Sequence, residues 1–283
     1  MGKLFLVATP IGNLNDMSPR AVETLKQADL IAAEDTRNSI RLLNHFDIRV
    51  PMTSYHEYNR IEKAEELIGK MRSGADVALI TDAGMPAISD PGEDLVRMCY
   101  EAGIEVTIIP GPCAAVSALA MSGLPTGRFV FEGFLPNDKN KKERDARLEE
   151  LKNETRTIIF YEAPHRLVRT LELLTAAFGS CRRASTVREL TKVHEEVRKT
   201  TLGELLEKYR SEEPRGEFVI VVEGRDPKEL IEEERSRWED ISIRKHVEQY
   251  MLDGFDKKEA MKKVAADRGI GKREVYKECM NQI

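Results

Sequence analysis

The sequence is poor in cysteine, and its cysteines form no pair. Cys99, Cys113, Cys181 and Cys279 are scattered along the chain without any CxxC spacing. This distribution excludes a disulfide framework and a zinc ribbon or finger, and it fits a reducing compartment. No cluster of His, Cys and Asp has metal-ligand spacing either, so we expect chemistry without a metal ion.

Long apolar runs and a positive net charge are missing too. The first apolar segment, residues 4–9, is short and stops at a proline, which favours a first strand over a signal peptide. No segment is long enough to cross a membrane, and we expect a cytoplasmic protein. The net charge of −5 and an isoelectric point near 5.8 exclude a uniformly basic nucleic-acid binder. Any contact with nucleic acid must come from local basic patches.

The sequence signatures of common catalytic sites are absent as well. There is no GxGxxG after the first apolar run, and GxxxxGK[ST], GxSxG and HExxH do not occur. These absences argue against a dinucleotide-binding Rossmann site, a P-loop, a nucleophile elbow and a zinc protease. We therefore expect a site that holds a small molecule mainly through backbone groups.

What is present is a repeated unit of apolar strand, turn-rich or polar loop, and helix. Five expected strands end in such loops, after Thr9, Ile80, Ile109, Tyr161 and Val187. Repeated units of this kind predict an α/β fold with parallel layers. With 283 residues the chain has room for one large domain or two ordinary ones.

Two changes in composition predict boundaries in the chain. A polar, charged run at residues 136–144 separates an expected domain at 1–136 from one at 137–225. Beyond Gly224 the sequence predicts a charged linker and then a small helical extension at 240–283. Part of this extension resembles a helix-turn-helix, a loose pattern that is often only a packing hairpin.

The most informative loop covers residues 81–92. It follows an apolar run at 77–80 that indicates a buried parallel strand, and it precedes a helix with acidic residues in its first turn. Open α/β sheets bind ligands at the carboxyl ends of their strands, so this loop is a candidate ligand site. The alternative is a tight connection without a ligand. Asp90 could act in the site or only cap the helix that begins at Gly92.

Two other strand ends carry polar residues. Residues 34–37 follow an expected strand and are either a site or an N-cap, made by Asp35 or Thr36. Pro164 fits the first position of a helix, which leaves a histidine and an arginine in the first turn, where cations oppose the helix dipole. A bound anion such as phosphate would explain them, and simple solvent exposure is the alternative. The dense charged cluster at 188–196 is either a further site or a solvated hairpin.

Seven motifs, taken in order, resemble those of the tetrapyrrole-methylase superfamily, in particular its members that methylate small-subunit ribosomal RNA. The motifs lie at residues 8–14, 33–37, 82–92, 110–115, 160–166, 188–192 and 216–218. The resemblance runs from about residue 4 to 224, and the C-terminal helices are similar too. Tetrapyrrole enzymes of the superfamily carry Gly-Pro-Gly and Gly-Asp-Pro in their first two loops. This chain has Thr-Pro-Ile-Gly at 9–12 and Thr-Asp-Ala-Gly at 81–84, which argues against a tetrapyrrole substrate.

The resemblance implies two α/β domains with S-adenosyl-L-methionine bound in the cleft between them, usually in a homodimer. It implies methyl transfer to the ribose 2′-hydroxyl of a cytidine in the decoding region of 16S rRNA, in the small ribosomal subunit. One alternative is a methyltransferase of the same fold that acts on a tetrapyrrole or on a protein histidine. Another is a non-enzymatic nucleic-acid regulator that uses the C-terminal helices.

The resemblance also assigns site residues. It places the cofactor against Pro10, Ile11, Asp82, Met85, Ile88, Cys113, Ala114, Tyr161, Ala163, Glu189 and Gly216. It makes Arg37, Arg166 and Arg188 contacts to RNA phosphates. A ribose hydroxyl is a poor acid, so a base or a stabilising cation should assist the transfer. The candidates for that role are Glu34, Asp90, His165 and Lys192, and the sequence does not choose among them.

Overall fold

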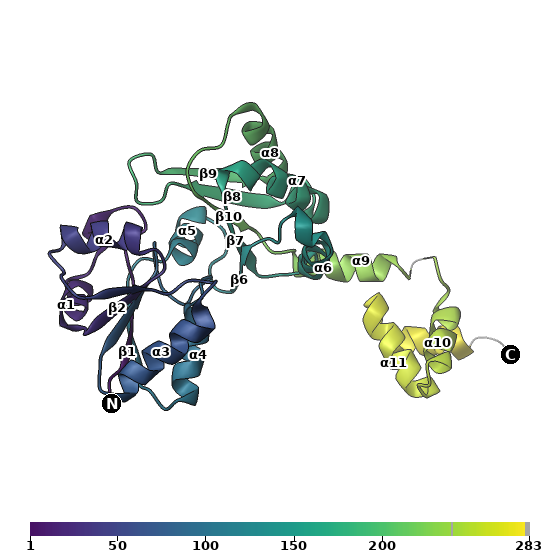
Figure 1. The fold of residues 1–283 in the computed structure, drawn as a ribbon. Coiled ribbons are helices and arrows are strands. Elements are labelled where there is room, and N and C mark those ends of the chain that lie inside the picture. The colour runs from purple at the N-terminus through teal and green to yellow at the C-terminus, as the bar shows by residue number, and fades with distance from the viewer. Residues whose placement is uncertain (239, 281–283) are drawn as a thin grey trace. The chain divides into compact units, whose positions relative to one another are not determined.

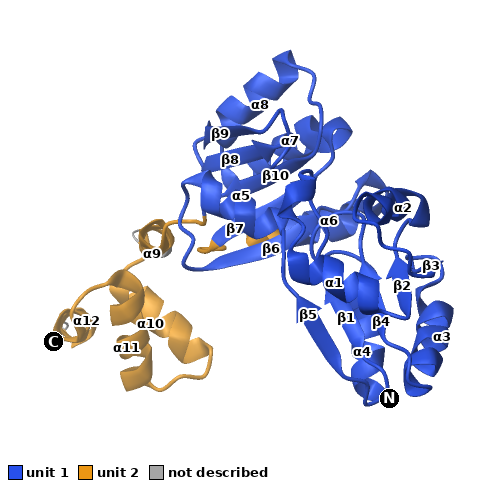
Figure 2. Cartoon of the chain, turned by 90° about the vertical axis from the view of Figure 1, so that its left-hand side faces the viewer, with its two compact units in different colours: residues 1–148, 157–223 blue, residues 149–156, 224–283 orange. Residues whose placement is uncertain are grey.

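The computed structural model describes residues 1–238 and 240–280 (Figure 1). The chain divides into two compact units, which Figure 2 shows in blue and orange. Unit 1 comprises residues 1–148 and 157–223, and unit 2 comprises 149–156 and 224–283. Both sheets lie in unit 1. The domain boundaries expected from composition, 1–136, 137–225 and 240–283, stay predictions, and the end of the extension beyond Met280 lies outside the described residues.

The first sheet is entirely parallel, in the order β3-β2-β4-β1-β5. Its strands are β1 (Leu4–Val7), β2 (Leu30–Ala33), β3 (Met52–Ser54), β4 (Val77–Ile80) and β5 (Val106–Ile109). All four residues of β4 are buried, as expected for an apolar strand covered on both faces. The expected parallel layer is confirmed here. Only β3 was not predicted, because its three residues carry too weak a pattern.

Helices cover both faces of this sheet. They are α1 (Pro19–Gln27), α2 (Thr36–His45), α3 (Arg60–Arg72) and α4 (Gly92–Glu101), with a short 3-10 turn η1 (Leu14–Asp16) before α1. Leu25 of α1 and Leu43 of α2 share one apolar cluster, and Leu67 of α3 and Leu95 of α4 share another. Alternate residues of β4 enter the two clusters, so the clusters lie on opposite faces.

Local capping fixes where two of these helices begin. Ser18 Oγ accepts the N–H of Ala21 at 3.1 Å, and Pro19 occupies the first helical position. The Asp35 carboxylate accepts the N–H of Arg37 at 2.8 Å. The expected cap by Asp35 is therefore confirmed.

The second sheet is mixed, in the order β6-β7-β10-β8-β9. Its strands are β6 (Phe129–Phe134), β7 (Thr157–Glu162), β8 (Arg183–Arg188), β9 (Glu196–Thr201) and β10 (Phe218–Val222). Only β6 and β7 run parallel, while β10 is antiparallel to both β7 and β8, and β9 is antiparallel to β8. The expectation of a parallel layer is wrong here, because the last strand of the chain inserts between two earlier ones. Since β7 and β8 both oppose β10, their carboxyl ends still meet at one edge.

Helices pack on both faces of the second sheet as well. They are α5 (Ala114–Ser122), α6 (Lys141–Leu151), α7 (Leu167–Phe178) and α8 (Leu202–Ser211), with 3-10 turns η2 (Asp138–Asn140) and η3 (Pro164–Arg166). Although α5 follows β5 of the first sheet, its Ala118 packs in one cluster with Val221 of β10. On the other face Tyr209 of α8 lies edge-on against Phe218, with ring centroids 5.5 Å apart. Helix α5 thus joins the two halves of unit 1.

Unit 2 is helical. Its helices are α9 (Pro227–Ser236), α10 (Ile243–Leu252), α11 (Lys257–Arg268) and α12 (Lys272–Met280). Val247, Val264 and Val275, one from each of the last three helices, form its small core. Gly269 ends α11 in the left-handed conformation, with φ +62°. The three C-terminal helices are confirmed. No helix among the described residues has the length and apolarity needed to span a bilayer.

Candidate functional site

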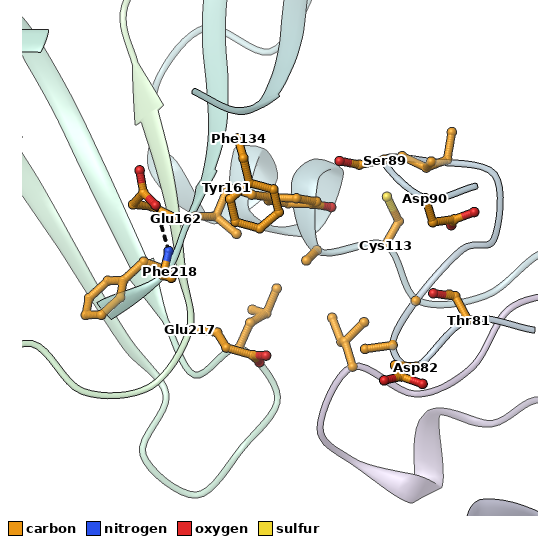
Figure 3. A pocket seen from close by; sticks show the side chains of 18 of the residues that line it. Thr81, Asp82, Ser89, Asp90, Cys113, Phe134, Tyr161, Glu162, Glu217 and Phe218 are labelled. Atoms are coloured by element: carbon orange, nitrogen blue, oxygen red, sulfur yellow. Dashed lines mark hydrogen bonds between the residues drawn. The ribbon is translucent and has the colours of Figure 1, made fainter. Parts of the chain in front are cut away.

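A cavity of about 600 Å³ lies in unit 1, where the carboxyl ends of the first sheet face the second sheet (Figure 3). Its lining comes from the loops after β1, β2, β4 and β5 on one side and from β7, β8 and β10 on the other. In the first sheet the loops after β1 and β4 lead to opposite sides, and ligands bind at such a switch point. The strand order therefore makes this cavity the candidate ligand site.

The loops after β1 and β4 are joined through their backbones. Thr9 and Gly84 exchange both backbone hydrogen bonds, at 2.9 and 3.2 Å, and Thr9 Oγ1 donates to the carbonyl of Thr81 at 3.1 Å. Gly84 has φ +89°, and a β-carbon there would lie 3.3 Å from Ile11 Cγ2. Glycine is required for this close approach. The bridge is buried and its peptide groups pair with each other, so it fixes the two loops against one another beside the cavity.

Carboxylates from neighbouring strands line one side. Thr81 Oγ1 donates to Glu34 Oε2 at 2.7 Å, which joins the ends of β2 and β4. The two oxygens of Asp82 accept the N–H of Asp35 at 3.2 Å and the side-chain amide of Asn38 at 3.0 Å. Asp82 thus ties the central loop to the start of α2.

Asp90 organises the far end of the same loop. Its Oδ1 accepts the N–H of Ala87 at 3.0 Å and of Gly92 at 2.7 Å, which holds Ala87 and Ser89 at positive φ angles of 66° and 65°. Its Oδ2 is buried and has no hydrogen-bond partner within the described part of the chain. Burial raises the pKa of Asp90, although the backbone N–H groups of Gly92 and Ala87 act to lower it, and the nearby charge of Glu34 adds to the rise. Asp90 thus holds the N–H of the first residue of α4 and also lines the cavity, and its action in the site stays a prediction.

An aromatic wall faces these carboxylates. Tyr161 of β7 lies edge-on to Phe131 and Phe134, with ring centroids 4.9 and 5.7 Å apart. Its hydroxyl oxygen accepts the N–H of Ala115 at 3.1 Å, in the first turn of α5. Burial raises the pKa of Tyr161 to about 12, so the phenol stays protonated. Phe134 lines the cavity with 48% of its surface exposed.

A lysine with two glutamates stands behind the cavity. Lys192 Nζ lies 2.9 Å from Glu189 Oε1 and 2.8 Å from Glu217 Oε2, and Glu217 lines the cavity. Burial tends to lower the pKa of Lys192, but hydrogen bonds to Glu217 and Glu189 outweigh it and raise the pKa. Burial likewise opposes ionisation of Glu189, and the Lys192 and Glu217 donors still lower its pKa. The group is therefore an ionised cluster, with Lys192 as a cation.

The cavity brings together most of the residues expected from the sequence. Its lining includes Ile11, Asp82, Met85, Ile88, Cys113, Ala114, Tyr161 and Ala163 of the expected cofactor contacts, and Glu34, Asp90 and His165 of the catalytic candidates. Pro10, Glu189, Gly216 and Lys192 are not part of the lining among the described residues. Lys192 and Glu189 both bind the lining residue Glu217, and Gly216 directly precedes it in the chain.

The three arginines expected to contact RNA are bound by the protein itself. Their partners are Asp35 for Arg37, Glu162 and the Leu135 carbonyl for Arg166, and Glu196 and the Arg215 carbonyl for Arg188. None of them lines the cavity. Arg166 is tied down by protein groups, so the two basic residues after Pro164 do not require a bound phosphate.

Sequence reasoning missed Phe134 and Glu217. Phe134 is the last residue of β6, and most other lining residues also lie at strand ends. Its position at a strand end is therefore a signal that the sequence offers. Glu217 belongs to the motif at 216–218, of which only Gly216 is predicted to contact the cofactor. Its role depends on Lys192, which lies 25 residues away in sequence.

Comparisons with known proteins agree with this arrangement. Residues 3–206 match the family described as Tetrapyrrole (Corrin/Porphyrin) Methylases. The chain is 51% identical to ribosomal RNA small subunit methyltransferase I of Halalkalibacterium halodurans, over 97% of this chain and 93% of the relative. It is 44% identical to the protein of that name from Thermotoga maritima, over 80% of this chain and 100% of the relative. A diphthine synthase crystal structure covers 79% of this chain and 90% of its own, with TM-score 0.61 and 16% identity, which supports the fold alone.

Proposed function

This chain belongs to the Tetrapyrrole (Corrin/Porphyrin) Methylases, and we propose that it methylates the ribose 2′-hydroxyl of a cytidine in the decoding region of 16S rRNA, using S-adenosyl-L-methionine. The observation that carries the proposal is the 51% identity over nearly the whole length of a ribosomal RNA small subunit methyltransferase I. The loops that carry the expected motifs also converge on one cavity, which is what a two-substrate transfer needs.

The residues of the cavity suit S-adenosyl-L-methionine, which supplies an activated methyl group when bound. The cofactor has a polar amino-acid end and apolar and aromatic parts. The lining offers the central loop at 81–85, the carboxylate of Asp82 and the apolar side chains of Ile11 and Met85. We expect these groups to hold it, with Cys113, Ala114, Tyr161 and Ala163 closing the other side.

Among the four catalytic candidates, the structure favours a carboxylate. A base must be able to accept the ribose proton at neutral pH. Lys192 is a cation held by two glutamates and does not meet this requirement. Asp90 lines the cavity, has a buried oxygen without a partner in the described residues, and has a raised pKa. We assign proton acceptance to Asp90, with Glu34 as the neighbouring carboxylate and His165 at the rim.

The relatives' name points to the small ribosomal subunit as the partner. We propose that the chain works in the cytoplasm as a homodimer, as the resemblance implies. A tetrapyrrole methyltransferase would instead label a porphyrinoid. A non-enzymatic regulator would bind a DNA site tightly and show no turnover.

The experiment uses methyl-labelled S-adenosyl-L-methionine and small ribosomal subunits from a strain that lacks this protein. We expect label in the RNA of these subunits and little in subunits from the parent strain, whose target is already modified. Failure of active, cofactor-binding protein to label either preparation would reject the function.

A further inference from the structure

Phe134 is an exposed aromatic ring in the lining of the cavity. It is 48% exposed. Tyr161 supports it from behind at 5.7 Å between ring centroids, and Tyr161 is itself fixed by Phe131 and the N–H of Ala115. An exposed ring on a rigid support is the arrangement on which an unstacked base lies.

The backbone on either side of Phe134 is held in place. Gly133 has φ +60°, and a β-carbon there would lie 3.3 Å from Ser89 Oγ, so β6 contacts the central loop next to Asp90. On the other side, Arg166 donates to the carbonyl of Leu135 at 2.5 Å. Phe134 therefore sits between the loop of the proposed base and the segment that follows β6.

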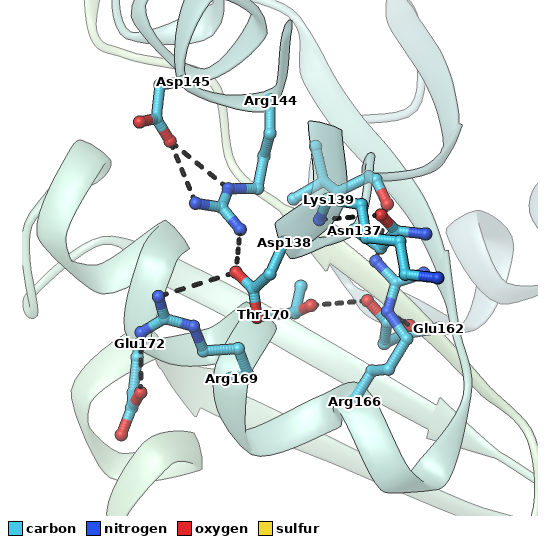
Figure 4. A network of polar contacts seen from close by, with 11 residues as sticks. Asn137, Asp138, Lys139, Arg144, Asp145, Glu162, Arg166, Arg169, Thr170 and Glu172 are labelled. Carbon is cyan, nitrogen blue, oxygen red and sulfur yellow. Dashed lines mark hydrogen bonds and ion pairs between the residues drawn. The ribbon is translucent and has the colours of Figure 1, made fainter. Parts of the chain in front are cut away.

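That following segment is basic. Lys139, Lys141 and Lys142 are exposed, and none has an ion-pair partner within the part of the chain that the structure describes. Figure 4 shows Asn137, whose side-chain oxygen accepts the N–H of Lys139 at 3.0 Å. The segment is connected to the cavity by Arg166, which donates to the Leu135 carbonyl and lies 3.4 Å from Glu162 of the lining. Three unneutralised cations thus begin five residues after the exposed ring.

The acidic residue of the segment is neutralised by the protein. Asp138 forms an ion pair with Arg144, whose side chain is only 3% exposed (Figure 4). Arg169 Nη2 lies 3.8 Å from Asp138 Oδ1. Arg144 also pairs with Asp145 at 3.2 Å. A buried arginine is costly unless it is fully paired, so this network fixes the shape of a surface segment while leaving its lysines free.

We propose that residues 134–142 form the platform for the acceptor RNA, with Phe134 stacking on the base of the target nucleotide and Lys139, Lys141 and Lys142 contacting the phosphates beside it. The inference rests on the proposed rRNA function and names the surface that serves it. A ribose in a stacked strand cannot reach groups inside a cavity, so the nucleotide must be turned out, and an exposed ring compensates for its lost stacking. Arg166 and Arg188 have side chains only 28% and 27% exposed and are paired with protein groups, whereas these three lysines are exposed.

The test measures binding and turnover on the full chain, with small subunits from the strain lacking the protein. We expect Phe134→Ala to raise KM for subunits by roughly tenfold or more while the Kd for S-adenosyl-L-methionine stays unchanged. Phe134→Tyr should have a KM for subunits close to that of wild type, because it keeps an aromatic ring. Phe134→Leu should have a raised KM like Phe134→Ala, since leucine keeps apolar area but offers no ring. A matching loss of cofactor affinity, or an unchanged KM, would overturn the base-stacking role.

The lysines are tested by the salt dependence of subunit binding, measured without methyl transfer. Changing Lys139, Lys141 and Lys142 together to Gln should reduce the slope of log K against log salt by about 2 to 3. The control changes Lys26, Lys70 and Arg72 to Gln, because these exposed residues lie in the last turns of α1 and α3 and do not line the cavity. Equal slopes for the two triple variants would overturn the platform. Subunit binding is measured independently of methyl transfer. Wild-type protein that binds subunits but transfers no methyl group would therefore reject the proposed function and leave the RNA platform standing.

Discussion

Gly216 lies directly against the carboxylate of Glu189. A β-carbon on Gly216 would stand 2.5 Å from Glu189 Cδ, and the residue has φ +83°. Glu189 cannot easily move away, because its Oε1 accepts both Lys192 Nζ and the N–H of Glu217. The glycine therefore keeps the ionised cluster against the wall of the cavity.

Gly216→Ala should destabilise the protein and lower its cofactor affinity. Alanine at this φ costs on the order of 1–3 kcal/mol in unfolding free energy before any clash with Glu189 is counted. Chemical denaturation and calorimetric titration with S-adenosyl-L-methionine measure the two effects. Gly179→Ala is the matched control, since Gly179 also has a positive φ, +91°, and a β-carbon there meets nothing within 4 Å. Equal stability of the two variants would show that the contact does not matter.

Lys192→Met should destabilise the protein by about 1 kcal/mol at neutral pH, because two glutamates lose their counter-cation. The pKa of Lys192 is raised above 10.5, so its stabilising effect is complete below that pH and is lost as pH rises through the raised value. The pKa of Glu189 is lowered from 4.5, so its effect is present above 4.5 and is lost as pH falls through the lowered value. The difference in unfolding free energy between wild type and variant should therefore shrink at both extremes of pH. A difference that is constant with pH would mean that packing, not charge, is responsible.

Asp82→Arg should abolish cofactor binding. The longer side chain enters the cavity, and the N–H of Asp35 and the amide of Asn38 lose their acceptor. Asp82→Asn keeps the size and one acceptor oxygen, so we expect a loss of about tenfold or less. Titration with S-adenosyl-L-methionine compares the two. Unchanged affinity of the arginine variant would remove Asp82 from the site.

Removal of residues 240–283 should weaken RNA binding more than cofactor binding. These helices have their own apolar core in unit 2, and the cavity lies wholly in unit 1. The Thermotoga maritima relative matches over its full length to only 80% of this chain. In the full chain, Arg273→Glu with Lys277→Glu tests the same point, since both residues are exposed on α12. Filter binding of subunits and cofactor titration are the measurements, and equal losses of both affinities would indicate a structural role for the extension.

Features that depend on neighbouring residues in sequence could be predicted. The cap by Asp35 involves a contact two residues away, and the strand and loop at 77–92 follow from one apolar run and its glycines and prolines. Eleven of the expected site residues line one cavity. Their convergence could be predicted because parallel strands end at one edge of a sheet and because the motifs resemble those of the family.

Features that depend on distant partners could not be predicted. The direction of β10 is set by its insertion between β7 and β8, which no local pattern records. Arg188 looked available for phosphate, but its partner is a carbonyl 27 residues later in the chain. The exposed lysines Lys139, Lys141 and Lys142 lie in the charged run at 136–144, whose composition predicts only a domain boundary.

The central claim is that this cavity directs a methyl group to a ribose hydroxyl of small-subunit rRNA. The most direct measurement is mass spectrometry of nucleosides and nuclease fragments from subunits of the strain lacking the protein, after incubation with S-adenosyl-L-methionine and wild-type or Asp90→Asn protein. We expect 2′-O-methylcytidine at one position in the decoding region with wild-type protein, and much less with the variant although it binds the cofactor. A methyl group on a base, or no ribose methylation by wild-type protein that binds the cofactor, would contradict it.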